Sequence, residues 1–303
     1  MNESSKTRQG VILALAAYIM WGIAPIYFKI VSEVPAEEVL IHRIIWSFLL
    51  LALLLFFTKK LSNVRQLFKQ PKSLMYLVVT SVLISINWLL FTWAVMSDRL
   101  LDASLGYYIN PLFNVVLAMV FLGERFRRLQ WLAVGLATIG VMVEIFAFGS
   151  LPWIALVLAS TFGCYGLLRK KVNLDAMTGL FVETLMMVPV AAIYLLAFAD
   201  SATSDMTANP MTLNLLLISA GWITTLPLLC FTSAATKIRL STLGFFQYIG
   251  PSMMFVMAVS FFGEDFSADK ATTFGFIWCA LAIFIYDAIR QRQKPAPKPQ
   301  EAC

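Results

Sequence analysis

Ten long apolar runs, separated by short polar connections, are the feature of this 303-residue sequence that most limits its fold. Hydrophobic residues make up 60% of the chain and charged residues only 13%, which is more apolar surface than a water-soluble core can hide. A helix needs about 20 apolar residues to cross a bilayer. We therefore predict membrane spans at residues 10–30, 38–57, 74–97, 102–122, 129–148, 151–168, 176–199, 211–234, 241–262 and 271–289.

The basic residues indicate how these spans are oriented. Of the 23 Lys and Arg residues, all but Lys29, Arg43, Arg99 and Lys270 fall at the N-terminus, in every second connection or in the tail. Lys and Arg concentrate on the cytoplasmic side of membrane proteins, so we predict that both termini are cytoplasmic. The net charge of +6 is then a topology signal, and we expect no nucleic-acid partner.

The second half of the sequence repeats the first at an offset of 140 positions. Tyr108–Pro111 matches Tyr248–Pro251, and ten of the 28 positions from 108 to 135 have identical mates. The Gly-Glu pair at Gly123 keeps the same offset to the pair at Gly263, although these residues lie in connections. Similar composition in two apolar helices does not explain a constant offset that includes connecting residues. Towards the first span the match needs a one-residue gap, which aligns Gly22 with Gly163.

These observations predict an all-α polytopic membrane protein of ten transmembrane helices, arranged as two five-helix repeats. The first repeat is residues 1–148, and the second is residues 149–303 with a short disordered cytoplasmic tail at 294–303. Because five is an odd number, the second repeat enters the membrane inverted. Inverted repeats are typical of transporters that open alternately to the two sides of a membrane.

Several stretches resemble the drug/metabolite transporter superfamily, in particular its ten-helix members with two EamA-type units. The resemblance is carried by Gln9–Tyr18, Trp21–Pro25, Ala103–Pro111 and Ser241–Pro251, and it covers nearly the whole chain except the tail. It implies a multi-pass permease of a bacterial inner membrane, surrounded by lipid, that acts on a small-molecule substrate. It implies neither the natural substrate nor the oligomeric state, and a homodimer stays open.

Matched prolines mark the candidate substrate site. Pro111 and Pro251 lie near the centres of predicted spans in corresponding positions of the two repeats. Interruptions of this kind point to a binding site, although two packing kinks are the alternative. Amide and phenol groups at such depth need partners or a wet cavity. The candidate substrate-binding residues are Arg43, Asn87, Trp88, Tyr107, Tyr108, Asn110, Pro111, Gln247, Tyr248 and Pro251.

Four ionisable residues inside predicted spans require an explanation, because charge in the membrane is costly and usually functional. We expect Arg43 to contact substrate and to pair with Glu144. Glu183 is the preferred candidate for proton coupling, with Glu144 and His42 as further candidates. A structural hydrogen bond is the alternative for Glu183, and a structural role is the more common one for a lone histidine such as His42.

Other classes of function are less consistent with the sequence. There is no P-loop, and the four cysteines and one histidine have no metal-site spacing, so we expect no cofactor and no metal. We do not expect an enzyme, because no cluster of carboxylates, HExxH motif or Ser-His pair occurs at membrane depth. The sequence predicts a secondary transporter of small organic solutes. The alternative is an intramembrane enzyme or a channel that acts on a small molecule or lipid.

Overall fold

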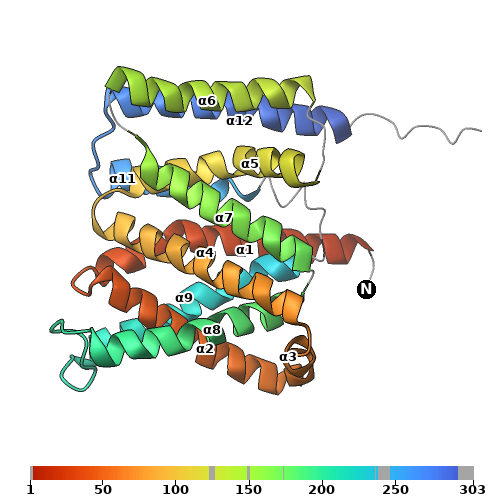
Figure 1. Ribbon diagram of the computed structural model, residues 1–303. Helices are drawn as coiled ribbons and strands as arrows, with labels where there is room; N and C mark the ends of the chain where they lie inside the picture. Colours follow the sequence, from red (N-terminus) through yellow and green to blue (C-terminus); the bar gives the residue numbers. More distant parts are fainter. Residues whose placement is uncertain are drawn as a thin grey trace, which may run out of the picture. The chain divides into compact units, whose positions relative to one another are not determined.

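The computed structural model describes residues 3–122, 127–148, 151–172, 174–235, 237 and 246–292, and the regular structure in this part is entirely helical (Figure 1). The helices are α1 (Glu3–Ile30), α2 (Ala36–Phe57), α3 (Leu61–Leu67), α4 (Pro71–Met96), α5 (Leu100–Leu122), α6 (Arg128–Phe148), α7 (Trp153–Val172), α8 (Ala176–Ala197), α9 (Met211–Ala235), α11 (Ile249–Ser260) and α12 (Ala268–Arg292).

A helix occupies each predicted range, and most bounds agree within a few residues. The main differences are α1, which begins earlier than predicted, and α11, which begins only at Ile249, after a turn at Gln247 and Tyr248. Residues 241–245 of the predicted range 241–262 lie outside the described residues. The short helix α3 was not predicted. It turns Val64 and Leu67 inward between exposed polar residues.

Six helices of the described part are long and apolar enough to cross a membrane, judged by length and composition. They comprise Thr7–Ile30, Ala36–Phe57, Pro71–Met96, Met177–Ala197, Met211–Phe231 and Lys270–Asp287. Many of their large apolar side chains face outward, such as Phe56, Val190 and Leu196. An exposed surface of this kind matches lipid rather than water.

Local signals begin and end the helices. Asp175 caps α8 by accepting hydrogen bonds from the Thr178 N–H at 3.2 Å and the Thr178 hydroxyl at 3.0 Å. Burial opposes ionisation of this carboxyl, but Thr178 and the Lys60 ammonium together hold the pKa of Asp175 below its usual range. A different signal ends α2. Just after its C-terminus, Lys59 has a positive φ of 56°, and the Lys60 N–H donates a hydrogen bond back to the Leu55 carbonyl at 3.1 Å.

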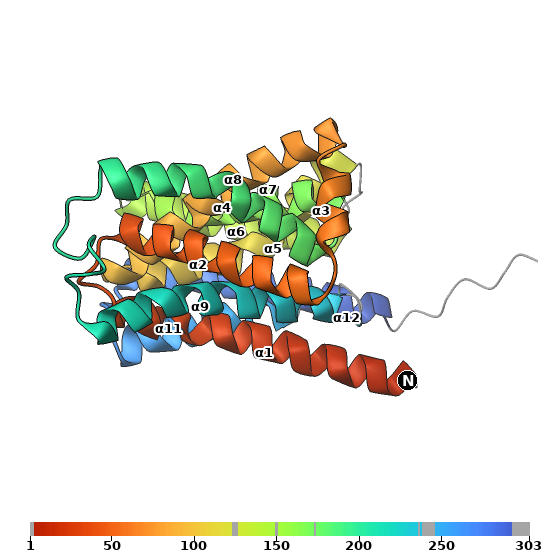
Figure 2. The same cartoon turned by 90° about the horizontal axis from the view of Figure 1, so that it is seen from below.

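The chain forms two compact units that do not coincide with the two sequence repeats. One unit is Met1–Leu117 with Trp153–Asp265, and the other is Ala118–Pro152 with Phe266–Cys303. In the first unit, α9 lies between α1 and α2 in both views, and α4 packs against α7 (Figures 1 and 2). The largest helix contacts therefore join the two halves of the sequence.

The second unit is built on the contact between α6 and α12. The two helices lie side by side (Figure 1), and a Cβ added at Gly140 would lie 2.8 Å from the Phe276 Cβ. Arg127 Nη2 lies 2.9 Å from Asp287 Oδ2, and the Asp287 side chain is almost fully buried. Here too, one helix comes from each half of the sequence.

Glycines allow the closest helix contacts in the first unit. A Cβ at Gly22 on α1 would lie 2.7 Å from the Met253 Sδ, and a Cβ at Gly163 on α7 would lie 2.7 Å from the Phe113 Cδ1. Gly22 and Gly163 are mates in the sequence repeat, and Phe113 and Met253 are mates at the offset of 140. The two contacts are therefore equivalent: in each, the glycine of one half of the chain meets the corresponding large side chain of the other half.

Gly221 brings α9 against the backbone of α2, and this contact yields a test of the packing. A Cβ at Gly221 would lie 2.6 Å from the Trp46 carbonyl carbon, which cannot move as a flexible side chain can. We expect Gly221→Ala to lower the free energy of unfolding by about 1–3 kcal/mol, measured by thermal unfolding of the purified protein in detergent.

The matched control is Gly166→Ala, because a Cβ at Gly166 on α7 would meet nothing within 4 Å. Alanine is the better helix former, so this variant should be as stable as the wild type or slightly more stable. Equal melting temperatures for the two variants would contradict the proposed close contact between α2 and α9.

Candidate functional site

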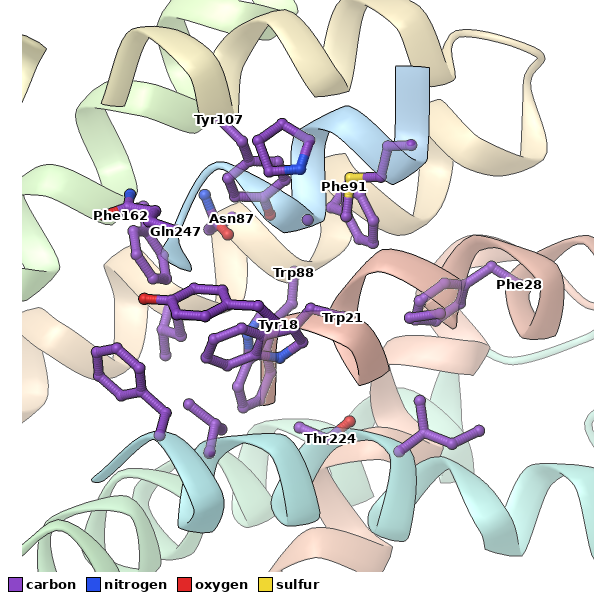
Figure 3. A pocket seen from close by; sticks show the side chains of 18 of the residues that line it. Tyr18, Trp21, Phe28, Asn87, Trp88, Phe91, Tyr107, Phe162, Thr224 and Gln247 are labelled. Carbon is purple, nitrogen blue, oxygen red and sulfur yellow. The ribbon is translucent and has the colours of Figure 1, made fainter. Parts of the chain in front are cut away.

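A cavity of about 130 Å³ lies inside the first compact unit. Side chains from α1, α2, α4, α5, α7, α9 and α11 converge on it, together with the turn that precedes α11 (Figure 3). The lining residues are Tyr18, Trp21, Ala24, Phe28, Arg43, Ile84, Asn87, Trp88, Phe91, Tyr107, Phe162, Ile223, Thr224, Leu228, Phe231, Gln247, Gly250, Pro251 and Met254.

The walls of the cavity are mainly aromatic. Tyr18, Trp21 and Phe231 form one cluster, with ring centroids 5.5–6.0 Å apart. Phe91 forms a second cluster with Phe28 at 5.7 Å and Tyr107 at 5.6 Å. Four of these five contacts are edge-to-face and that of Trp21 with Phe231 is tilted, arrangements in which each ring restricts the orientation of its neighbours.

Arg43 supplies the charge of the cavity. Its Nε donates to the Thr224 hydroxyl at 3.0 Å, and its Nη1 donates to the Thr92 hydroxyl at 3.0 Å. The guanidinium carbon lies 4.8 Å from the Trp88 ring centroid and 5.1 Å from that of Phe28, distances at which a cation is attracted to the ring face. Only 7% of the residue is exposed, and every described partner is neutral.

Asn87 is almost fully buried in α4 and connects that helix to α7. Its Nδ2 donates to the Leu158 carbonyl at 3.1 Å and to the Thr161 hydroxyl at 3.0 Å. The side chain therefore fixes one wall of the cavity. Buried amides need such partners, because an unpaired one is costly away from water.

The residues around Pro251 differ from the prediction. We expected Pro251 well inside a helix, but α11 begins at Ile249, so the proline lies in the first helical turn. N–H groups in the first turn of a helix have no acceptor within the helix, so a proline, which lacks an N–H, fits there without a kink. Gln247 and Tyr248 form a turn before the helix, and this turn places the Gln247 side chain at the cavity. Pro111 lies within α5, and its side chain is outside the described residues.

Three other candidate binding residues lie outside the cavity lining. The Tyr108 hydroxyl is 2.8 Å from the Ser252 hydroxyl, and the buried Asn110 Oδ1 accepts from Asn114 Nδ2 at 2.8 Å. The Tyr248 hydroxyl is buried without a partner in the described part of the chain. Arg43, Asn87, Trp88, Tyr107, Gln247 and Pro251 are thus brought together, whereas Tyr108, Asn110 and Tyr248 are not among the lining residues.

The candidate coupling residue Glu183 lies in a separate polar cluster. Its side chain is fully buried and accepts from the Thr80 hydroxyl at 2.7 Å and the Tyr165 hydroxyl at 3.2 Å. Arg169 Nη1 lies 3.7 Å from Glu183 Oε1, and the guanidinium occupies the space that a side chain at Gly179 would fill. Thus Glu183 has a cation and two hydroxyl groups as partners.

The other two coupling candidates are placed less fully. His42 is buried, and its Nδ1 accepts from Trp46 Nε1 at 3.3 Å, which is consistent with a structural role. Glu144 belongs to α6, but its side chain is outside the described residues, so its pairing with Arg43 stays a prediction.

Of the two Gly-Glu pairs in the repeats, only the one at Gly263 lies in the described residues. Its Glu264 accepts hydrogen bonds from the N–H groups of Leu100 and Leu101 and so caps α5.

Much of the aromatic lining, including Tyr18, Phe28 and Phe231, is not among the residues predicted from the sequence. The repeat gives a signal for part of this lining: ten of the 19 lining residues, including Phe231, are repeat mates, whereas Tyr18 and Phe28 have no mate in the lining. The pairs are Ile84 with Thr224, Trp88 with Leu228, Phe91 with Phe231, Tyr107 with Gln247 and, across the one-residue gap, Trp21 with Phe162.

Comparisons with known proteins point to one family. The sequence model of the EamA-like transporter family matches residues 8–146. The chain is 59% identical to the protein RarD of Escherichia coli K12 over 292 residues, which are 96% of this chain and 99% of that protein. It is 56% identical to an uncharacterized transporter of Vibrio cholerae, over 95% of both chains.

More distant similarity extends to a second RarD and to a solved structure. The chain is 31% identical to a chloramphenicol-sensitive protein RarD of Pseudomonas aeruginosa, over 95% of this chain and 97% of that protein. A crystal structure with 16% identity matches 93% of this chain and 99% of that chain with a TM-score of 0.61. At that identity the match shows a shared fold and nothing further.

The Glu183 cluster gives a prediction about stability. Arg169→Met leaves the Glu183 carboxylate buried without a cation, so we expect a loss on the order of 3 kcal/mol in the free energy of unfolding. Glu183→Gln in the same chain removes the stranded charge and should restore part of that loss. Thermal unfolding of the wild type, both single variants and the double variant measures the coupling between them. Additive losses would contradict a direct interaction between the two side chains.

Proposed function

Because the chain belongs to the EamA-like transporter family, we propose that it is a secondary transporter that carries small organic solutes across a bacterial inner membrane. In this proposal the solute binds in the cavity of the first compact unit, and access to the cavity alternates between the two sides of the membrane. The relatives from Escherichia coli and Vibrio cholerae support membrane transport in general.

We further propose that ten helices span the membrane as two inverted repeats, residues 1–148 and 149–303, with both termini in the cytoplasm. The helix bounds support this arrangement, because mates begin 140 positions apart. The pairs are α2 at Ala36 with α8 at Ala176, α4 at Pro71 with α9 at Met211, and α6 at Arg128 with α12 at Ala268. The exchanged contacts of Gly22 and Gly163 also support it.

The observation that carries the proposal is that ten of the 19 lining residues of the cavity form five pairs of repeat mates. A site built from equivalent positions of two inverted repeats lies on the axis that relates them, and so has an equivalent relation to both faces of the membrane. Such a site can be opened to either side by exchanging the conformations of the two repeats. A site made from one repeat alone has no such property.

Charged groups outside the cavity are candidates for coupling and gating. Glu183 is buried, carries a carboxylate and is held by neighbouring side chains from α4 and α7. We propose that proton coupling, where it occurs, involves this cluster, with His42 and Glu144 as further candidates. Rearrangement of Arg169 against Glu183 is a change that a proton could drive, because protonation removes the charge that Arg169 faces.

The test of the function is flux that depends on the cavity. A metabolite panel is first screened for thermal stabilisation of the purified protein, since ligands that bind the folded state raise its melting temperature. Counterflow of a stabilising compound is then measured in proteoliposomes. We expect Trp88→Ala to lower the rate about tenfold, or about 1.4 kcal/mol, because this ring contributes to the lining and contacts Arg43.

The control is Trp222→Ala, because Trp222 belongs to the same unit but is half exposed on the outside of α9. This variant should keep the wild-type rate. Undiminished counterflow in Trp88→Ala would contradict the assignment of the cavity, and the absence of flux for every compound that binds would contradict the transport function.

A further inference from the structure

The lining of the cavity has one sign of charge. Arg43 is its only ionisable group that is charged at neutral pH, and no Asp or Glu is among the described lining residues. Among the residues whose side chains the structure describes, the ionisable groups that interact electrostatically with Arg43 are Tyr107 and Tyr27, both of which are phenols. The buried carboxylate of Glu183 has its own cation in Arg169.

The Arg43 guanidinium is held so that part of it stays available. Nε and Nη1 are bound by Thr224, Thr92 and the Trp88 carbonyl, whereas Nη2 has no hydrogen-bond partner in the part of the chain that the structure describes. The aromatic rings of Trp88 and Phe28 also lie against it, with centroids 4.8 Å and 5.1 Å from the guanidinium carbon. A desolvated charge with only neutral partners is costly, and an anion that reaches Nη2 offsets this cost by a charge-assisted hydrogen bond.

Other polar groups of the cavity also favour an acceptor. The Tyr107 hydroxyl and the Gln247 amide have no hydrogen-bond partner among the described residues, and both can donate. Their positions are repeat mates, so donors come from both halves of the chain. Asn87 uses both of its amide protons on α7 and adds no further donor.

The rest of the wall is complementary to a flat apolar body. The ring clusters around Tyr18 and Phe91 present edges and faces at fixed angles. A ring that enters between them buries apolar surface and gains offset or edge-to-face contacts. The cavity volume of about 130 Å³ limits the occupant to a small molecule.

From these features we infer that the cavity binds a small organic anion, in which a carboxylate or comparable oxyanion is attached to an aromatic body. The oxyanion lies at Arg43 Nη2, and the ring lies between the aromatic clusters. This inference rests on the proposed transport function and specifies its class of substrate.

A set of three probes with the same ring and chain length tests the charge preference. The probes are 3-phenylpropionate, 3-phenylpropanamide and 3-phenylpropylamine, which are anionic, neutral and cationic at neutral pH. Binding to the purified protein is measured by calorimetry and by thermal stabilisation. We expect the carboxylate to bind at least about tenfold more tightly than the amide, which corresponds to about 1.4 kcal/mol, and the amine to bind most weakly. Equal or tighter binding of the amide or the amine overturns the inference, as does the absence of binding by all three.

Variants assign the preference to Arg43. In Arg43→Gln the ratio of carboxylate to amide affinity should fall close to one, whereas Arg99→Gln, which removes the same charge from a half-exposed side chain, should keep the wild-type ratio. Thr224→Val keeps the cation but removes the partner of Nε, so it should lower the ratio without abolishing it. This variant provides a second test if Arg43→Gln does not fold. A wild-type ratio in every variant that folds contradicts the role of Arg43.

Counterflow separates failure of this inference from failure of the transport function. Carriage of the amide or the amine in preference to the carboxylate leaves a transporter whose substrate is not an anion. A probe that binds in the cavity but is never carried, together with no flux of any compound from the metabolite panel, contradicts the transport function itself.

Discussion

Close contact between helices from the two halves of the chain is the constraint on which the cavity depends. Within lipid, helices gain little from the hydrophobic effect on association, so packing of small residues and polar contacts between helices stabilise the bundle. Here a Cβ at Gly106 on α5 would lie 2.9 Å from the Ala155 carbonyl oxygen on α7, and Gly221 allows α9 to reach the backbone of α2. The helices that make these contacts, α2, α5, α7 and α9, all contribute residues to the cavity, so residues from both halves surround it.

The same arrangement explains how a buried arginine is tolerated. Arg43 lies on α2, and its neutral partners come from α1, α4 and α9. Two hydroxyls, one carbonyl and two ring faces compensate part of the cost of removing the cation from water. What they do not supply is a negative charge, and a substrate that supplies it would be bound most strongly at the centre of the unit.

The helices could be predicted from the sequence because an apolar run of about 20 residues has few other structures available in lipid. The repeat also gave useful candidates, since Tyr107 and Gln247 are mates and both line the cavity. The aromatic lining could not be separated from lipid-facing residues, because Phe28 and a residue such as Phe56 look alike in an apolar run. The position of Pro251 in a first turn depends on where α11 begins, which apolar composition does not specify. The neutral partners of Arg43 come from other helices, and the sequence does not specify which hydroxyl groups and rings these helices bring to the guanidinium.

The central claim is that the two repeats are inverted with respect to the membrane, so that a cavity lined by repeat mates relates equally to both faces. Reporter proteins fused after residue 148 and after residue 290 test it most directly, with one reporter active only outside the cytoplasm and the other active only inside. The account predicts that the fusion after residue 148 lies outside and the fusion after residue 290 lies in the cytoplasm. Location of both fusions in the same compartment would contradict the inversion, and with it the alternating use of the cavity.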